Sequence, residues 1–185
     1  IIFLSAAEYN TASSDNALVG LTLKYKINSS TKLYGQLMLD ELKVSEYTAN
    51  KGWWANKFAM QLGVKSAKVF GINNTFGFTE INLAKPYMYT HRNSQRSYSH
   101  FNDALAHPLG ANFIESVSRL EQQYKNFRTF IQINYARYGA DSAIGNVGNN
   151  ILLSYNTRNS EYGNKILQGV NSSLLYVDAR LAYVI

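Results

Sequence analysis

Hydrophobic and polar side chains alternate with a period of two along most of the chain. In the clearest stretch, 17–27, Val19, Leu21 and Leu23 share one face, and Lys24 and Lys26 share the other. Successive side chains of a strand point to opposite faces, so this pattern predicts a β-strand with one apolar and one polar face. Weaker alternation marks 75–85 and 113–124. Seven strands are expected in all, over residues 17–27, 32–42, 56–67, 75–85, 113–124, 127–139 and 172–185.

The connections between these strands alternate in length. Short polar turns at 28–31, 68–74 and 125–126 alternate with long loops near 43–55, 86–112 and 140–171. Bacterial outer-membrane β-barrels are built in this way, with tight turns at one end and long loops at the other. Aromatic residues near the strand ends predict two belts at the lipid headgroups. The residues concerned are Tyr25, Tyr34, Tyr124 and Phe127 at the turns, and Trp53, Trp54, Tyr87, Phe113 and Tyr138 at the loops.

Composition agrees with an all-β protein. The 185 residues include 14 Tyr, 9 Phe and 2 Trp but only 2 Pro, and the absence of Cys excludes disulfides and thiolate metal sites. No apolar run approaches the roughly 20 residues of a membrane helix, whereas a barrel strand needs only about 9–11 alternating residues. The formal net charge is +6, but the basic residues are scattered. A solvated surface is therefore favoured over nucleic-acid binding.

The polar face distinguishes a membrane barrel from a soluble antiparallel barrel or sandwich, which would show the same alternation. It carries many long charged side chains, as a wet or salt-bridged lumen would, and together with the loop asymmetry this favours an antiparallel transmembrane β-barrel. The carboxylates invite comparison with a glycosidase pair, but they are interleaved with Arg and Lys. A neutralised ladder that braces the lumen is the preferred interpretation, and no catalytic residue is assigned. The predicted members of this charge ladder are Asp40, Glu80, Glu115, Arg119, Glu121, Asp178 and Arg180.

The chain is expected to be an incomplete piece of a larger barrel, with residues 1–185 forming a single barrel segment. Single-chain bacterial barrels have even strand numbers, and here the pattern predicts an odd number and unfinished ends. A complete barrel of about 14–18 strands is expected on that basis. The sequence starts at Ile1 without Met or signal peptide, so a signal peptide is expected to have been removed or to lie outside this segment.

The loop 86–112 holds all three histidines of the chain, at irregular spacings. Metal binding is disfavoured because neither helical His spacing nor a Cys partner is present, and no metal or other cofactor is predicted. No nucleophile elbow, P-loop or dinucleotide motif is found. Aromatic faces with amide, acidic and basic side chains suit sugar rings and hydroxyls, so the loops are predicted to bind polysaccharide. The candidates are Trp53, Trp54, Tyr87, Tyr89, His91, Arg92, Tyr98, His100, Asp103 and His107.

Several segments resemble the Wzi-like capsule-assembly barrels, in particular the gliding-motility-associated outer-membrane barrels of that group. The strongest element is the run Leu-Ala-His-Pro-Leu-Gly-Ala-Asn at 105–112. Weaker elements occur at 39–41, 85–91, 98–102, 154–158 and 161–164. The resemblance implies a non-enzymatic protein of the bacterial outer membrane that binds or organises surface polysaccharide or supports gliding motility. Its expected partners are outer-membrane lipid, surface polysaccharide and other outer-membrane, secretion or motility proteins.

Three other functions stay open at this point. They are an accessory or anchor subunit of a secretion or motility complex, a pore for small solutes, and a membrane-embedded hydrolase. Co-purification in a stable complex, conductance in planar bilayers and loss of turnover in Glu115→Gln are the respective discriminating observations.

Overall fold

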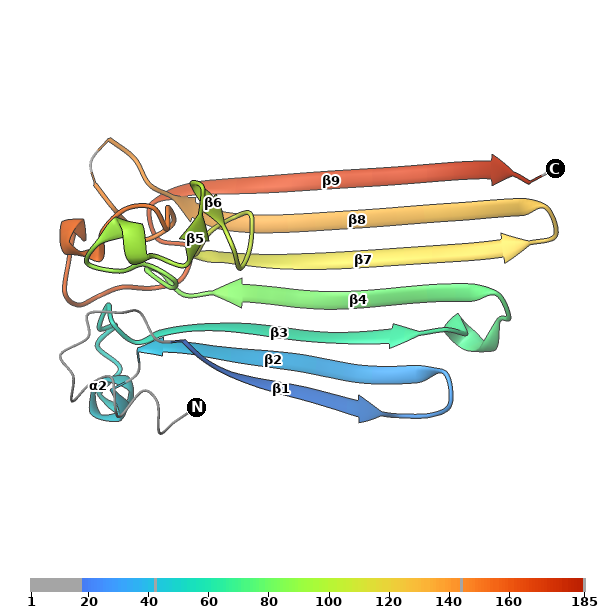
Figure 1. Cartoon of the computed structure of the whole chain (residues 1–185), viewed down its shortest axis with the longest axis horizontal. Helices are drawn as coiled ribbons and strands as arrows, with labels where there is room; N and C mark the ends of the chain where they lie inside the picture. Colours follow the sequence, from blue (N-terminus) through green and yellow to red (C-terminus); the bar gives the residue numbers. More distant parts are fainter. Residues whose placement is uncertain (1–17, 42, 144, 185) are drawn as a thin grey trace.

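A computed structural model describes residues 18–41, 43–143 and 145–184 of the chain. Seven long strands follow one another in a single antiparallel sheet, each paired with its neighbour in the chain (Figure 1). This confirms the seven predicted strands and the all-β, antiparallel class. The strands are β1 (Val19–Lys26), β2 (Thr31–Glu41), β3 (Lys57–Ser66), β4 (Thr75–Ala84), β7 (Phe113–Tyr124), β8 (Phe127–Ala140) and β9 (Val170–Tyr183).

Short turns join the strands at one end of the sheet, on the right in Figure 1. In the β1–β2 turn, Asn28 Oδ1 accepts hydrogen bonds from the backbone N–H groups of Ser30 at 2.9 Å and Thr31 at 2.8 Å. This is the local bond by which Asn favours tight turns. The turn between β7 and β8 consists of two residues, Lys125 and Asn126, and Lys125 has a φ of 52°. The β3–β4 turn contains the 3₁₀ turn η1 (Val69–Gly71).

The long connections gather at the opposite end of the sheet (Figure 1). They contain regular secondary structure that the polarity of these segments did not predict. The first contains helix α2 (Val44–Ala49). The second contains the 3₁₀ turn η2 (Ser94–Arg96) and a small hairpin of β5 (Ser99–His100) and β6 (Asp103–Ala104). The third contains the 3₁₀ turn η3 (Tyr155–Thr157). Polar caps support these turns: the Asn93 side chain accepts from the N–H of Gln95 at 3.1 Å.

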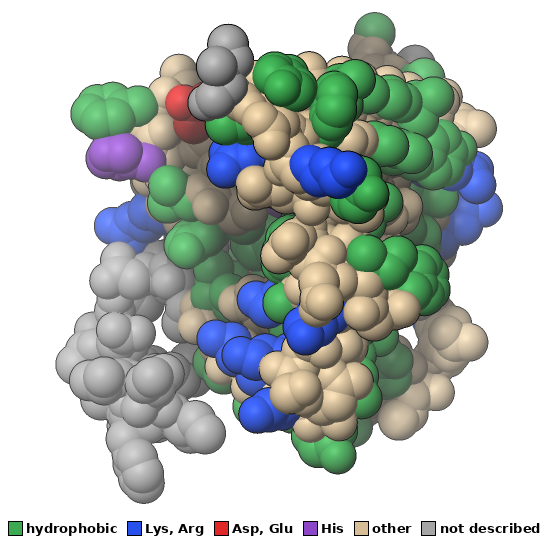
Figure 2. Space-filling view, turned by 90° about the vertical axis from the view of Figure 1, so that its right-hand side faces the viewer, with side chains coloured by type: hydrophobic (Ala, Val, Ile, Leu, Met, Phe, Trp, Pro, Cys, Tyr) green, Lys and Arg blue, Asp and Glu red, His purple; other side chains and the backbone are tan. Residues whose placement is uncertain are grey.

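The register gathers the apolar side chains on one face of the sheet. Directly opposed residues of antiparallel strands share a face, and the pairs include Leu37 with Met60 and Ile133 with Val177. We call this side the apolar face. It is exposed to an unusual degree, with Leu21 at 69%, Leu175 at 68% and Leu181 at 72%. Figure 2 looks onto the short-turn end and shows hydrophobic side chains gathered along one side of the molecule.

The opposite side, which we call the polar face, is covered at its loop end by the long connections. Ala59, Ala84 and Phe113 of this face pack with Met88 and Tyr89 of the second connection, and Ala111 and Ile151 complete the buried cluster. Alanine on the strands lets the loops approach the sheet closely. The hydrophobic core therefore lies between the loops and the polar face rather than between two sheets.

The predicted aromatic belts are only partly found on the apolar face. Tyr25, Tyr124 and Phe127 lie there beside the short turns and are exposed. Tyr34 lies on the polar face instead, where its hydroxyl donates to Glu80 at 2.6 Å. At the loop end the prediction is wrong for Tyr87 and Phe113, which are 0% and 2% exposed. Tertiary packing of the loops takes these rings inward.

Within the described residues the sheet is open, since β1 pairs with β2 alone and β9 with β8 alone. Among the helices of those residues, none is long and apolar enough to span a membrane.

Candidate functional site

A cleft of about 930 Å³ lies between the polar face and the underside of the second long connection. Strands β2, β3, β4, β7, β8 and β9 contribute its floor, and residues 105–109 contribute part of its roof. Its size falls within the usual range for ligand sites. The polar side chains along it are mainly amides, carboxylates and phenols: Gln36, Gln61, Glu80, Asn82, Tyr89, Tyr98, Glu115, Gln132, Asn134 and Tyr176.

Two carboxylates in this cleft accept hydrogen bonds from the same side-chain amide. Asn82 faces Glu115 directly in the β4–β7 pairing and follows Glu80 by two positions on the same strand. Its Nδ2 donates to Glu80 Oε1 at 3.2 Å and to Glu115 Oε2 at 3.1 Å. Glu115 is 7% exposed and Asn82 is 8% exposed. Register alone brings these three residues together, because they alternate on the same face of neighbouring strands.

His107 connects the loop to this group. Its Nε2 lies 2.9 Å from Glu115 Oε2, and its ring stacks on Phe113 with centroids 4.3 Å apart. The Nδ1 atom accepts the backbone N–H of Leu109 at 3.2 Å. Because Nδ1 is an acceptor, Nε2 carries the proton and donates to the carboxylate. His107 thus fixes residues 105–109 above the sheet as a neutral hydrogen-bond donor.

Tyr89 and Tyr98, two further candidates from the loops, also line the cleft. Their ring centroids lie 5.9 Å apart. Tyr89 is 6% exposed, and burial raises the pKa of its phenol to about 12. Tyr89 therefore stays neutral at the edge of the cleft, beside the more exposed ring of Tyr98.

Trp53, Trp54 and Tyr87 lie apart from the cleft in an aromatic cluster between the long connections. Trp54 packs on Tyr155 with centroids 4.7 Å apart, and the Arg158 guanidinium lies 4.3 Å from the centre of the Trp54 ring. Trp53 meets Trp54 edge-on at 6.2 Å. Tyr87 is fully buried and donates to the Asn146 carbonyl at 2.9 Å, so it offers no ring face to a ligand.

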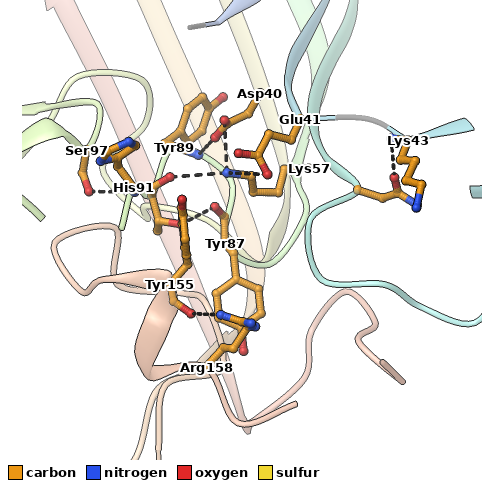
Figure 3. Close-up of polar contacts among 12 residues, drawn as sticks. Asp40, Glu41, Lys43, Lys57, Tyr87, Tyr89, His91, Ser97, Tyr155 and Arg158 are labelled. Carbon is orange, nitrogen blue, oxygen red and sulfur yellow. Dashed lines mark hydrogen bonds and ion pairs between the residues drawn. The ribbon is translucent and has the colours of Figure 1, made fainter. Parts of the chain in front are cut away.

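Asp40 and Lys57 form a buried ion pair that anchors the second connection. The Lys57 Nζ lies 3.1 Å from Asp40 Oδ1, and both side chains are 1% exposed. Asp40 Oδ2 accepts the N–H of Tyr89 at 3.0 Å, while Lys57 donates to the Thr90 carbonyl at 3.4 Å (Figure 3). A β-bulge between Leu39 and Glu41 makes this pairing possible. Asp40 therefore holds the loop rather than bracing a lumen ladder.

The predicted charge ladder is divided into separate groups. Near the short turns, Arg119 pairs with Glu121, and Arg180 donates to Asp178 at 2.9 Å. Both guanidinium groups lie against the Phe130 ring, at 4.7 and 5.1 Å from its centre. Glu80 and Glu115 instead receive their hydrogen bonds from Tyr34, Asn82 and His107. The interleaving expected from the sequence thus applies to the turn end and not to the cleft.

The other loop candidates are distributed over the connections. His91 is 7% exposed, with its N–H bonded to Ser97 Oγ at 3.2 Å, and the Arg92 carbonyl accepts from Ser154 Oγ at 2.6 Å. His100 and Asp103 lie on the exposed β5–β6 hairpin, outside the cleft. Nowhere in residues 18–41, 43–143 and 145–184 do three His, Cys, Asp or Glu side chains gather as a metal site would require.

Sequence reasoning missed Lys57, Asn82, Tyr155 and Arg158 as site residues. Asn82 carried a usable signal, because it alternates with Glu80 on a predicted strand. Trp54 and Tyr155 are 101 positions apart in the chain, and no local pattern predicts their contact.

Comparison with known proteins finds no matching family, no curated relative and no similar solved structure.

Proposed function

We propose that the chain is part of a transmembrane β-barrel of the bacterial outer membrane that binds surface polysaccharide without catalysing a reaction. The observation that carries the proposal is the contrast between the two faces of the sheet. The apolar face is exposed from Leu21 on β1 to Leu181 on β9, and the long connections cover the polar face. Lipid is the solvent in which such an arrangement is stable.

The dimensions of the apolar face agree with this assignment. Phe127 and Tyr135 lie on it eight positions apart along β8. At about 3.3 Å per residue this spans roughly 26 Å, against a lipid-facing band of about 25 Å in outer-membrane barrels. Tyr124, Phe127 and Tyr183 form an exposed aromatic row beside the short turns. Rings of this kind are enriched at the membrane interface.

The open edges of β1 and β9 favour a piece of a larger barrel. Unpaired strand edges are not tolerated in hydrocarbon, so further strands would close the sheet. The similarity to the Wzi-like capsule-assembly and gliding-motility barrels supports the same architecture. The run 105–112, which carries that similarity most strongly, builds the roof of the cleft through His107, Pro108 and Leu109.

The cleft supports polysaccharide as the ligand. Its amides and carboxylates offer hydrogen bonds to hydroxyl groups, and Tyr98, which is 39% exposed, offers a ring surface for a sugar face. The long connections folded over the polar face favour binding over free passage of solutes.

Membrane fractionation tests the barrel, and polysaccharide retention tests the ligand. Expressed with an export signal, the protein is expected in the outer-membrane fraction, resistant to extraction with alkaline carbonate, and shifted on gels by boiling. Cells that carry it should retain more surface polysaccharide than cells that lack it. A monomer that remains in solution without detergent would contradict the barrel, and unchanged retention would contradict the polysaccharide role.

A further inference from the structure

The charge of the cleft differs from the charge of the chain. The sequence has a formal net charge of +6, which by itself suggests an anionic ligand. Yet none of the described residues that line the cleft is Lys or Arg, whereas Glu80 and Glu115 both line it. Cationic side chains of the polar face lie outside this lining: Lys57 in the buried ion pair, Arg119 and Arg180 against Phe130, and Lys65 over the Tyr34 ring at 5.3 Å. Lys24, Lys26, Lys32 and Arg128 share that face toward the short turns.

The hydrogen bonds of the two carboxylates leave their charges in place. Tyr34 and Asn82 hold Glu80, and Asn82 and His107 hold Glu115. All three donors are neutral, since His107 accepts at Nδ1 from Leu109 and donates from Nε2. Hydrogen bonds from neutral donors fix the carboxylates in position without supplying a positive charge. Two negative charges within one partly enclosed cleft attract a cation and repel an anion.

We infer that this cleft binds a hydroxylated ligand that carries a protonated amine, of the kind an amino-sugar segment presents, in preference to an acidic sugar. The inference rests on the proposed polysaccharide-binding role and names the class of sugar. The amine lies beside Glu80 and Glu115. Gln61, Gln132 and Asn134 bond the hydroxyl groups, and Tyr98 packs on a sugar face.

Titration calorimetry with the detergent-solubilised protein tests this inference with three trisaccharides: the glucosamine trimer, its fully N-acetylated form and the galacturonic acid trimer. The glucosamine trimer is expected to bind at least about tenfold more tightly than the acidic trimer, with the acetylated form between them. Glu115→Gln and Glu80→Gln should each reduce the preference for the amine and leave binding of the acetylated trimer nearly unchanged. Gln keeps the size of the side chain, so the cleft should keep its shape.

Glu121→Gln is the matched control, because it removes the same charge from the same face of β7 outside the cleft. It should leave the preference unchanged. Equal or tighter binding of the acidic trimer, or a preference unaffected by both cleft variants, overturns the inference while polysaccharide binding stands. Failure of all three sugars to bind overturns the inference and counts against the polysaccharide role as well. Heat-dependent gel mobility of the same preparation reports separately on the barrel.

Discussion

His107 Nε2 lies 2.9 Å from Glu115 Oε2 and thereby joins the second long connection to the polar face of β7. The two residues come from features that the sequence presents as unrelated, a histidine-containing loop and an alternating strand. Their contact defines the roof and the floor of the cleft. It also means that the position of residues 105–109 depends on a side chain of the sheet.

Replacing His107 by Ala is expected to loosen this roof. The variant loses the hydrogen bond to Glu115 and the stack on Phe113, at a cost of about 1–2 kcal/mol to local stability. Hydrogen exchange of the amides in 105–112 should accelerate accordingly. His100→Ala, in the exposed hairpin of the same connection, should leave those amides unaffected. Equal exchange in the two variants would show that His107 does not hold the roof.

A charge on the apolar face should be far more costly than one on the polar face. Val177 is 58% exposed at the centre of β9, opposite Ile133. Val177→Arg is expected to reduce the free energy of folding into lipid vesicles by about 2–4 kcal/mol, as at a bilayer midplane. The neighbouring Tyr176→Arg, on the opposite face, is the control. Urea titration in vesicles measures both variants, and an equal cost in the two would contradict a lipid-facing apolar side.

Breaking the Asp40–Lys57 pair from one side should destabilise the protein strongly. Asp40→Ala leaves the Lys57 ammonium buried with one partner fewer. The free energy of unfolding is expected to fall by about 3–5 kcal/mol. The double variant Asp40→Ala/Lys57→Met removes the stranded charge and should recover most of this loss. Denaturant unfolding measures both effects. Glu46→Ala, which removes the ion-pair partner of the exposed Lys43, should change stability little. A double variant as unstable as Asp40→Ala would contradict the stranded-charge explanation.

Asn112 should be a sensitive polar residue of the loop end. Its buried side chain donates to the carbonyls of Gly139 and Gln168, each at 2.8 Å, and accepts the N–H of Leu167 at 2.7 Å. Asn112→Ala is expected to cost about 3 kcal/mol because these buried groups lose their partner. Faster proteolytic cleavage within 141–169 is the measurement.

Two further variants separate the contributions at this position. Asn112 has a φ of 57°, which Gly adopts without strain, so Asn112→Gly isolates the loss of hydrogen bonds from backbone strain. Asn126→Ala removes one exposed bond, of 2.8 Å, to the Val184 carbonyl and should have a small effect. Cleavage rates that are equal in Asn112→Gly and the unmodified protein would show that the side chain does not hold the third connection.

The strands and their faces could be predicted from the sequence because the underlying signal is local. Alternation such as Val19–Leu21–Leu23 against Lys24–Lys26 depends on the chain geometry of a single strand, and Asn28 and Lys125 mark turns that close within a few residues. Once neighbouring strands pair through short turns, the register follows from matching their apolar sides. The segment 113–124 alternates only weakly, yet it forms strand β7, because β4 and β8 pair with it on either side.

The site was less predictable because its contacts join distant segments. Six of the ten loop candidates divide evenly between the cleft and the loop interior: Tyr89, Tyr98 and His107 line the cleft, and Trp54, Tyr87 and His91 pack among the loops. Both groups consist of aromatic side chains and one histidine, so the sequence predicts the same polarity for both. What separates them is how three connections fold against one another, and no periodicity within any one connection records that.

The sequence by itself determined the seven amphipathic strands, their antiparallel order and the separation of short turns from long connections, since each depends on interactions between near neighbours in the chain. The tertiary structure alone decided that the loops fold onto the polar face, that Asp40 pairs with Lys57 across a bulge, and that Glu80 and Glu115 meet at Asn82. These arrangements depend on burial and on hydrogen bonds between segments far apart in sequence, which become defined only when the sheet has brought them together.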